Sequence, residues 1–211
     1  MSALTVCFSG LLFGALHVLS GPDHLAALAP FAVEARRRAW TLGLRWGIGH
    51  SGGIIGVGAV AYVIRDRLDL GLLEGLGKNA VGAILIAIGL WGFYHMRGVE
   101  LGAEAEPNGR HLHTTAAFLV GGVHGIAGTG YLLGVLPLLA LSSWLEAGAY
   151  LAGFAAGTIA AMILFSSLLG LLAQGTGSRA LRTYRRVFAG TSAAALVVGI
   201  IWIVLPLVQS S

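Results

Sequence analysis

Apolar residues occupy long stretches of this chain, and short polar segments separate them. A helix needs about 20 apolar residues to cross the hydrocarbon core of a bilayer, and segments of roughly 17–25 residues do so. Six stretches reach that length, at residues 3–33, 40–64, 79–96, 114–141, 144–173 and 187–208. The pattern predicts an all-α integral membrane protein with six transmembrane helices.

Two of these stretches, the first and the fourth, are longer than one crossing requires and contain helix breakers. The first holds Gly21-Pro22, and the fourth holds Gly121-Gly122 followed by a glycine-rich run at 125–130. Proline lacks a backbone donor and clashes with the preceding helical turn. A broken helix persists within a membrane only where protein or a water-lined cavity satisfies its backbone. We therefore expect the functional site at these two breaks.

The two broken stretches also resemble each other. Residues 14–30 read GALHVLSGPDHLAALAP and residues 121–137 read GGVHGIAGTGYLLGVLP, with five identities at a constant offset of 107. The identical pairs are Gly14 and Gly121, His17 and His124, Gly21 and Gly128, Leu25 and Leu132, and Pro30 and Pro137. Chance matching in a chain rich in Gly and Leu is the alternative explanation.

The offset is about half the chain length, so each half holds three predicted helices. Because three is an odd number, the second half must enter the membrane from the opposite face, as in the inverted repeats of many secondary transporters. We expect a first three-helix repeat at residues 1–96, a polar linker at 97–113 and a second three-helix repeat at 114–211.

The composition is also that of a protein surrounded by lipid. Of the 211 residues, 56% are apolar and only 10% carry a formal charge, whereas about a quarter are charged in a soluble domain. The alternative is an unusually apolar soluble bundle. The net charge of +4 comes from short basic clusters between apolar stretches, so no nucleic-acid partner is expected. Glycine-rich helix faces leave a homo-oligomer open.

The basic clusters predict an orientation. The first, third and fifth loops together hold nine Lys or Arg residues, the second loop holds three and the fourth holds none. By the positive-inside rule, the protein lies in the cell membrane with the three basic loops facing the cytoplasm and both termini outside the cytoplasm. The third loop also contains His111 and His113, which form either a surface metal-binding pair or part of a solvated linker.

Few ionisable residues lie within the apolar stretches, and each one is costly to bury in a membrane. They are His17, Asp23 and His24 in the first stretch, Arg45 and His50 in the second, and His124 in the fourth. On a regular helix His17 and His24, two turns apart, would share one face. His95, at the end of the third stretch, is expected at the membrane interface.

These residues suggest one metal site, made of His17, Asp23, His24, His50 and His124. Imidazole nitrogens with one carboxylate suit Ni²⁺, Co²⁺, Zn²⁺ or Cu²⁺. Cys7 is the only cysteine, which excludes a thiolate cage, and Mg²⁺ and Ca²⁺ would require more oxygen ligands. Two alternatives stay open, namely histidines that form hydrogen bonds between helices and a His-Asp proton relay.

Three short segments resemble the nickel/cobalt transporter superfamily. Residues 17–24, HVLSGPDH, resemble the first-helix motif His-x4-Asp-His of the nickel/cobalt permeases, with one additional residue after His17. The segment LRWGIGHS at 44–51 is similar to their second motif, which ends Leu-Gly-His-Ser. Residues 124–128, HGIAG, resemble a segment of the compact six-helix NicO and UreH-like proteins. The fourth helix lacks the acidic residue of the larger permeases' third motif.

The resemblance implies that His17, Asp23, His24 and His50 recognise a transition metal, and that a metalloenzyme-maturation protein is a partner. We predict a transporter of Ni²⁺ or Co²⁺, with Zn²⁺ also open, that works by alternating access. The ion would be the substrate, no prosthetic group is expected, and the chain is not expected to be an enzyme. The competing hypotheses are a membrane-embedded metalloenzyme and a proton-coupled transporter of another cargo.

Overall fold

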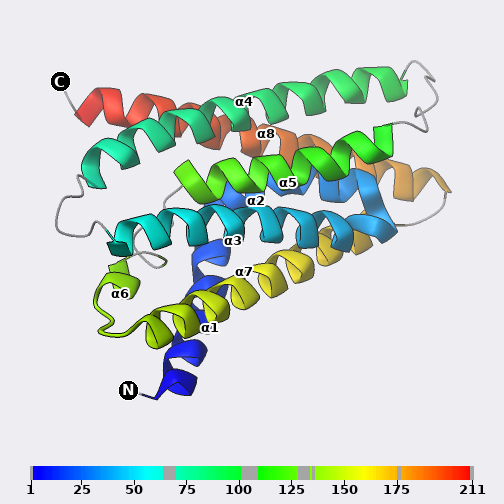
Figure 1. Ribbon diagram of the computed structural model, residues 1–211. Coiled ribbons are helices and arrows are strands. Elements are labelled where there is room, and N and C mark those ends of the chain that lie inside the picture. Colours follow the sequence, from blue (N-terminus) through cyan, green and yellow to red (C-terminus); the bar gives the residue numbers. More distant parts are fainter. Residues whose placement is uncertain are drawn as a thin grey trace.

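All regular structure in the described part of the chain is helical. The computed structural model describes residues 2–63, 70–100, 109–127, 134, 136–174 and 177–209. In chain order the elements are α1 (Ala3–Ser20), α2 (Pro22–Ala35), a 3₁₀ turn η1 (Arg36–Arg38), α3 (Ala39–Val63), α4 (Leu70–Glu100), α5 (Gly109–Ala127), α6 (Leu136–Leu139), α7 (Trp144–Leu172) and α8 (Gly177–Gln209) (Figure 1).

Four helical segments in these ranges are long and apolar enough to cross a membrane. They are Ala3–Ser20, Asn79–Met96, Trp144–Leu172 and Arg182–Leu205. A shorter apolar segment covers Thr115–Ile126. Large apolar side chains such as Leu4, Phe8 and Leu145 are more than half exposed, as expected for residues that face lipid. The predicted all-α membrane class is confirmed, while the six-crossing inverted repeat stays a prediction.

The structure has the helix break of the first apolar stretch at the predicted position, Gly21-Pro22. Helix α1 ends at Ser20, Gly21 adopts an extended conformation with φ −87° and ψ 102°, and Pro22 begins α2. Proline suits a first helical position, since its missing N–H would have no partner there. In the fourth stretch, α5 ends at Ala127 and α6 begins at Leu136. The intervening Gly128 and Leu132 lie outside the described residues.

The helices extend beyond the apolar stretches that predicted them. Residues 79–96 form only part of α4, and residues 187–208 form only part of α8. The segment at 97–113, expected as a linker, also contains the end of α4 and the start of α5. Hydropathy indicates where side chains meet lipid, whereas backbone hydrogen bonds continue a helix into polar surroundings, so the helices run past the predicted apolar stretches.

Three helix pairs organise the described part of the bundle. Helix α1 packs along α7 and α5 packs along α3, while α3 also contacts α7 and α4 packs along α8. Figure 1 shows α4 with α8 along one side and α1 with α7 along the other, and α2, α3 and α5 lie between them. The short half-helix α2 contacts α3, α4, α7 and α8, so its N-terminal residues face the interior.

Glycines allow these helices to approach closely. A Cβ at Gly14 of α1 would collide with the backbone carbonyl of Phe154 in α7, and one at Gly121 of α5 would collide with the carbonyl of Trp46 in α3. Small residues at such contacts let membrane helices pack through their backbones. The resulting interior holds a cluster of apolar residues from α2, α3, α4 and α7, including Leu28, Trp46 and Met162.

Candidate metal centre

The break at Gly21 brings the ends of two helices to one place. His17 lies in the last turn of α1, and Asp23 and His24 lie in the first turn of α2. A Cβ at Gly21 would collide with the Nδ1 atom of His24 and would lie 3.1 Å from Oδ1 of Asp23. Glycine at this position therefore leaves the space that the two side chains need.

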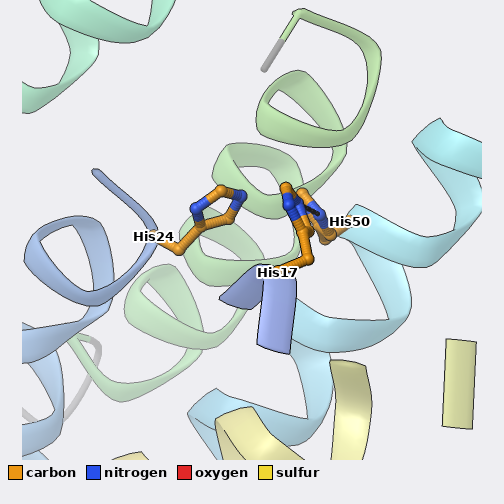
Figure 2. A group of neighbouring side chains, drawn as sticks. All are labelled: His17, His24 and His50. Atoms are coloured by element: carbon orange, nitrogen blue, oxygen red, sulfur yellow. Dashed lines mark hydrogen bonds between the residues drawn. The ribbon is translucent and has the colours of Figure 1, made fainter. Parts of the chain in front are cut away.

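Three histidines from three helices converge beside this break. His17 of α1, His24 of α2 and His50 of α3 each offer one ligand atom, and these atoms lie within 4.8 Å of one another. Figure 2 shows the three imidazoles gathered together, with a nitrogen of His24 turned toward the other two rings. All three side chains are buried, with at most 4% of their surface exposed.

The closest pair is His17 and His50. Their Nε2 atoms lie 3.3 Å apart, and their rings are stacked with centroids 5.4 Å apart. The two nitrogens can share a hydrogen bond when one of them carries a proton. In a tetrahedral site with metal–nitrogen bonds of about 2.0–2.1 Å, two nitrogens lie about 3.3–3.4 Å apart. The observed spacing therefore also matches two ligands of a single ion.

Asp23 lies directly behind His24. Its Oδ1 atom lies 3.1 Å from Nδ1 of His24, and both side chains are fully buried. No described donor forms a well-aligned hydrogen bond with either carboxylate oxygen. A carboxylate that contacts the far nitrogen of a histidine orients the ring and raises its basicity as a metal ligand. A buried anion also requires a nearby positive charge, which a cation among the histidines would supply.

His124 lies at the edge of the group rather than in it. Its ring centroid is 5.9 Å from that of His24, and its Nδ1 atom is 3.0 Å from the carbonyl oxygen of Val120. The nitrogen beside a carbonyl must carry the proton, so Nε2 keeps its lone pair. That atom is buried and has no hydrogen-bond partner among the described residues. The structure thus separates His124 from the three converging imidazoles.

Aromatic side chains enclose the histidines on two sides. Trp46 of α3 stacks on His50 with ring centroids 4.6 Å apart and also contacts the rings of His24 and His124. Phe154 of α7 lies 5.6 Å from His17, measured between ring centroids. Sequence reasoning did not identify either residue as part of the site. Trp46 lies one helical turn before His50 and so shares its face of α3, but that spacing is equally typical of an ordinary core residue.

The described cluster thus combines complete burial with unsatisfied polar atoms. Ring nitrogens of His24, His50 and His124 and both oxygens of Asp23 form no well-aligned hydrogen bond with a described residue, although Oδ1 of Asp23 lies 3.1 Å from Nδ1 of His24. Buried polar groups nearly always have partners, and exceptions usually mark an unseen ion, water or functional site. A neutral imidazole offers its lone pair to a metal or a proton. The arrangement can therefore bind a cation or transfer a proton.

The other sequence-derived candidates lie elsewhere. His95 is partly exposed and lies 3.3 Å from Glu34, measured from Nε2 to Oε1, away from the three-histidine group. Arg45 is on an exposed face of α3. The side chains of His111 and His113 lie outside the described residues, so a metal-binding role for that pair stays a prediction. Cys7 is a free, partly buried thiol on α1.

Comparison with known proteins gives relatives in plants and bacteria. The chain is 31% identical to chloroplast protein FOR GROWTH AND FERTILITY 1 of Arabidopsis thaliana, over 93% of this chain and 58% of that protein. It is 31% identical to chloroplast protein FOR GROWTH AND FERTILITY 2 of the same plant, over 95% of this chain and 56% of that protein. No family model matches the chain, and no solved structure matches it.

A bacterial protein matches over a larger share of its length. The chain is 24% identical to the urease accessory protein UreH of Bacillus sp. (strain TB-90), over 80% of this chain and 77% of that protein. The chain spans little more than half the length of the two plant relatives. The similarity to UreH agrees with the resemblance found in the sequence motifs, and no relative is an enzyme by name.

Proposed function

We propose that this protein carries a divalent transition-metal ion across a membrane, with Ni²⁺ and Co²⁺ as the leading substrates and Zn²⁺ as a further candidate. The observation behind this proposal is the convergence of three buried imidazoles from three helices. Nitrogen-rich sites favour these metals over Mg²⁺ and Ca²⁺. The similarity to the urease accessory protein UreH agrees with the motif resemblance to the nickel/cobalt transporter superfamily, which supports nickel.

The spacing of the ligands suggests how an ion is captured. His17 and His50 already have the separation of two ligands on one tetrahedral ion. Two nitrogens on opposite sides of one ion lie at most about 4.2 Å apart, which is less than the 4.8 Å spread of the group. His24 would therefore move inward when the ion binds, by at least several tenths of an ångström and by about 1.4 Å for a tetrahedral ion (4.8 minus 3.4), and Asp23 would move with it.

Binding and release then depend on the break between α1 and α2. Metal ligation requires neutral imidazoles, so protons compete with the ion for these nitrogens and favour its release. A transported ion must bind firmly enough to lose water and weakly enough to leave. Three neutral imidazoles and one orienting carboxylate carry less negative charge than the thiolate ligands of a closed structural metal site. They would therefore hold the ion less firmly. Alternating access would occur through movement of the half-helices that meet at Gly21.

An internal two-fold relation between the halves is part of the proposal. Gly14 meets the Phe154 carbonyl, and Gly121 meets the Trp46 carbonyl. The offset is 107 between the two glycines and 108 between the two aromatic residues. The first helix of each half therefore packs on the second helix of the other half. Such reciprocal packing supports two inverted repeats, at 1–96 and 114–211.

A second pair of contacts has the same offsets. A Cβ at Gly49 of α3 would collide with the carbonyl of Phe118 in α5, and one at Gly157 of α7 would collide with the carbonyl of Leu11 in α1. Phe118 and Leu11 differ by 107, and Gly157 and Gly49 differ by 108. A chance match of five residues in a glycine-rich chain would not predict these contacts, so they favour a structural repeat.

Location and partners follow from the same sources. The apolar helices support residence in a membrane, and the basic loops favour both termini outside the cell. The plant relatives carry the word chloroplast in their names, so an organellar membrane is the alternative location. A metalloenzyme-maturation protein is the partner that the name of the bacterial relative suggests.

The two competing functions make different demands on the same site. A membrane-embedded metalloenzyme would need a second acid or base near the ion, and Asp23 is the one carboxylate described beside the histidines. A proton relay would use the His17–His50 contact without binding metal. Nickel-dependent thermal stabilisation at micromolar metal would separate a metal site from a relay.

Transport in sealed vesicles tests the proposal. Purified protein would be reconstituted with a metal-sensitive dye inside the vesicles, and Ni²⁺, Co²⁺ or Zn²⁺ would be added outside. We expect metal-dependent dye quenching for the wild type and for H95Q, a histidine outside the group. We expect none for H24A at matched expression. Equal quenching by wild type and H24A would contradict the proposal.

A further inference from the structure

One face of α3 carries an arginine where lipid is expected. Arg45 is exposed and lies six residues after Ala39, the first residue of α3, which is about 9 Å along the helix axis. Further along the same face, Ile48 is 45% exposed and Ile55 is 40% exposed. A charged side chain beside apolar lipid-facing residues is costly unless its head reaches a polar partner.

The two other sides of α3 are occupied by protein. Gly43 and Gly47 pack against Met162 and Ile159 of α7. On the other side, Gly49 packs against Phe118 of α5. The face with Arg45 therefore points away from the bundle. On this face a Cβ at Gly52 or Gly56 would meet no described atom within 4 Å, so an open strip continues from Arg45 toward the middle of the helix.

A second arginine lies just before this face. Arg38 is exposed, ends the 3₁₀ turn η1 immediately before α3, and precedes Arg45 by seven residues. Neither arginine forms an ion pair with a described carboxylate, and Glu34, the nearest acid in sequence, lies beside His95. Trp40, between the two arginines in the chain, is 49% exposed, as is common at the level of lipid headgroups.

We propose that Arg38 and Arg45 bind the phosphate of an anionic phospholipid, with an acyl chain lying along the open strip at Gly52 and Gly56. Guanidinium groups bind phosphate through paired N–H donors, and long arginine side chains reach the headgroup level while their stems stay in lipid. A phosphate supplies the counter-charge that neither arginine finds among the described carboxylates of its own chain. This inference is independent of metal transport.

Lipid titration of the purified full chain tests this inference. Nanodiscs of phosphatidylcholine with increasing phosphatidylglycerol would be compared by native mass spectrometry and by the melting temperature of the protein. Each arginine near a membrane surface contributes about a fivefold increase in affinity for anionic lipid. Because that contribution is diffuse and R182Q would share it, we expect R38Q and R45Q each to weaken phosphatidylglycerol binding by more than about fivefold. R182Q is the matched control, since Arg182 is exposed on α8 and lies off this face.

Further measurements identify what binds to this face of α3. Inorganic phosphate at equal concentration should give no comparable stabilisation, because it lacks the acyl chain, and G52L should weaken lipid binding while leaving both arginines in place. An equal loss in R182Q would reduce the effect to diffuse positive charge and overturn the proposal. The proposal would be overturned in favour of a second copy on this face by two results together. Light scattering would show a dimer that G52L abolishes, and lipid binding would be unchanged in R45Q.

Discussion

The segments around residues 21 and 128 occupy matching places in the two halves of the sequence, but only the first carries an Asp-His pair. At the offset of 107, the positions of Asp23 and His24 correspond to Gly130 and Tyr131. His50 similarly corresponds to Thr158 at the offset of 108. Of the predicted site residues, the second half supplies His124 alone. Helix packing can thus be shared between halves while the candidate metal ligands are concentrated in one.

Thr158 illustrates the difference. Its hydroxyl donates a hydrogen bond to the carbonyl oxygen of Gly14 at 3.3 Å, and its side chain is fully buried. His50, at the matching position, instead directs a ring nitrogen toward His17. Thr158, which joins α7 to α1, therefore has His50, a potential metal ligand, as its counterpart in the first half. The comparison predicts large effects in the first half and small effects in the second.

The largest expected effect is that of H24A. Loss of a direct ligand should lower Ni²⁺ affinity more than loss of an orienting group, which costs about 10–100-fold. Isothermal titration of purified protein would measure the change. Y131A, at the matching position of the second half, should bind as the wild type does. Similar losses in the two variants would show that the halves contribute equally.

D23N should have the next largest effect. The amide keeps the shape of the carboxylate but lacks its charge, so it neither orients His24 as a strong acceptor nor balances the ion. We expect Ni²⁺ affinity to fall by about 10–100-fold, with the free energy of unfolding of the metal-free protein maintained or increased. Wild-type affinity in D23N would remove Asp23 from the site.

H124A should weaken binding less than H17A does. His124 lies outside the group whose ligand atoms converge, and its Nδ1 atom is engaged with the Val120 carbonyl. We expect a loss of no more than about tenfold, the lower end of the range for groups that act through a ligand. Isothermal titration of both variants gives the ratio of their Ni²⁺ affinities. A larger loss of affinity in H124A than in H17A would place His124 among the direct ligands.

T158V should have the smallest effect and should act on stability alone. It removes the hydrogen bond to Gly14, which is worth about 1 kcal/mol, and leaves the three histidines unchanged. Chemical unfolding in detergent would report the stability change in the absence of metal. A marked loss of Ni²⁺ affinity in T158V would mean that the second half shapes the ligand site directly.

The sequence was sufficient for features that depend on local chemistry. The helix break at Gly21-Pro22 follows from the backbone properties of these two residues, and the apolar stretches follow from the requirements of a bilayer. The meeting of His17 with His24 was also accessible, because both flank the break. Their approach to His50 depends on how α2 packs against α3, which no local pattern specifies, and the histidines were grouped by composition and resemblance instead.

Other parts of the site had no distinguishing pattern. Trp46 and Phe154 are aromatic residues in a chain where most positions are apolar, so nothing in their spacing separated them from ordinary core residues. Glu34 and His95 lie on different helices, and their contact depends on the packing of α2 with α4. Helix α4 ends and α5 begins within the segment expected as a linker, because helix ends depend on backbone hydrogen bonds rather than on hydropathy.

X-ray absorption spectroscopy of the Ni²⁺-loaded protein tests the central claim most directly, because it counts the imidazoles bound to the ion. The wild type should show scattering from three histidines, and H50A should show scattering from fewer with a longer or more disordered shell. A bound ion without histidine scattering, or a spectrum unchanged by H50A, would contradict the claim that these three side chains hold a single ion.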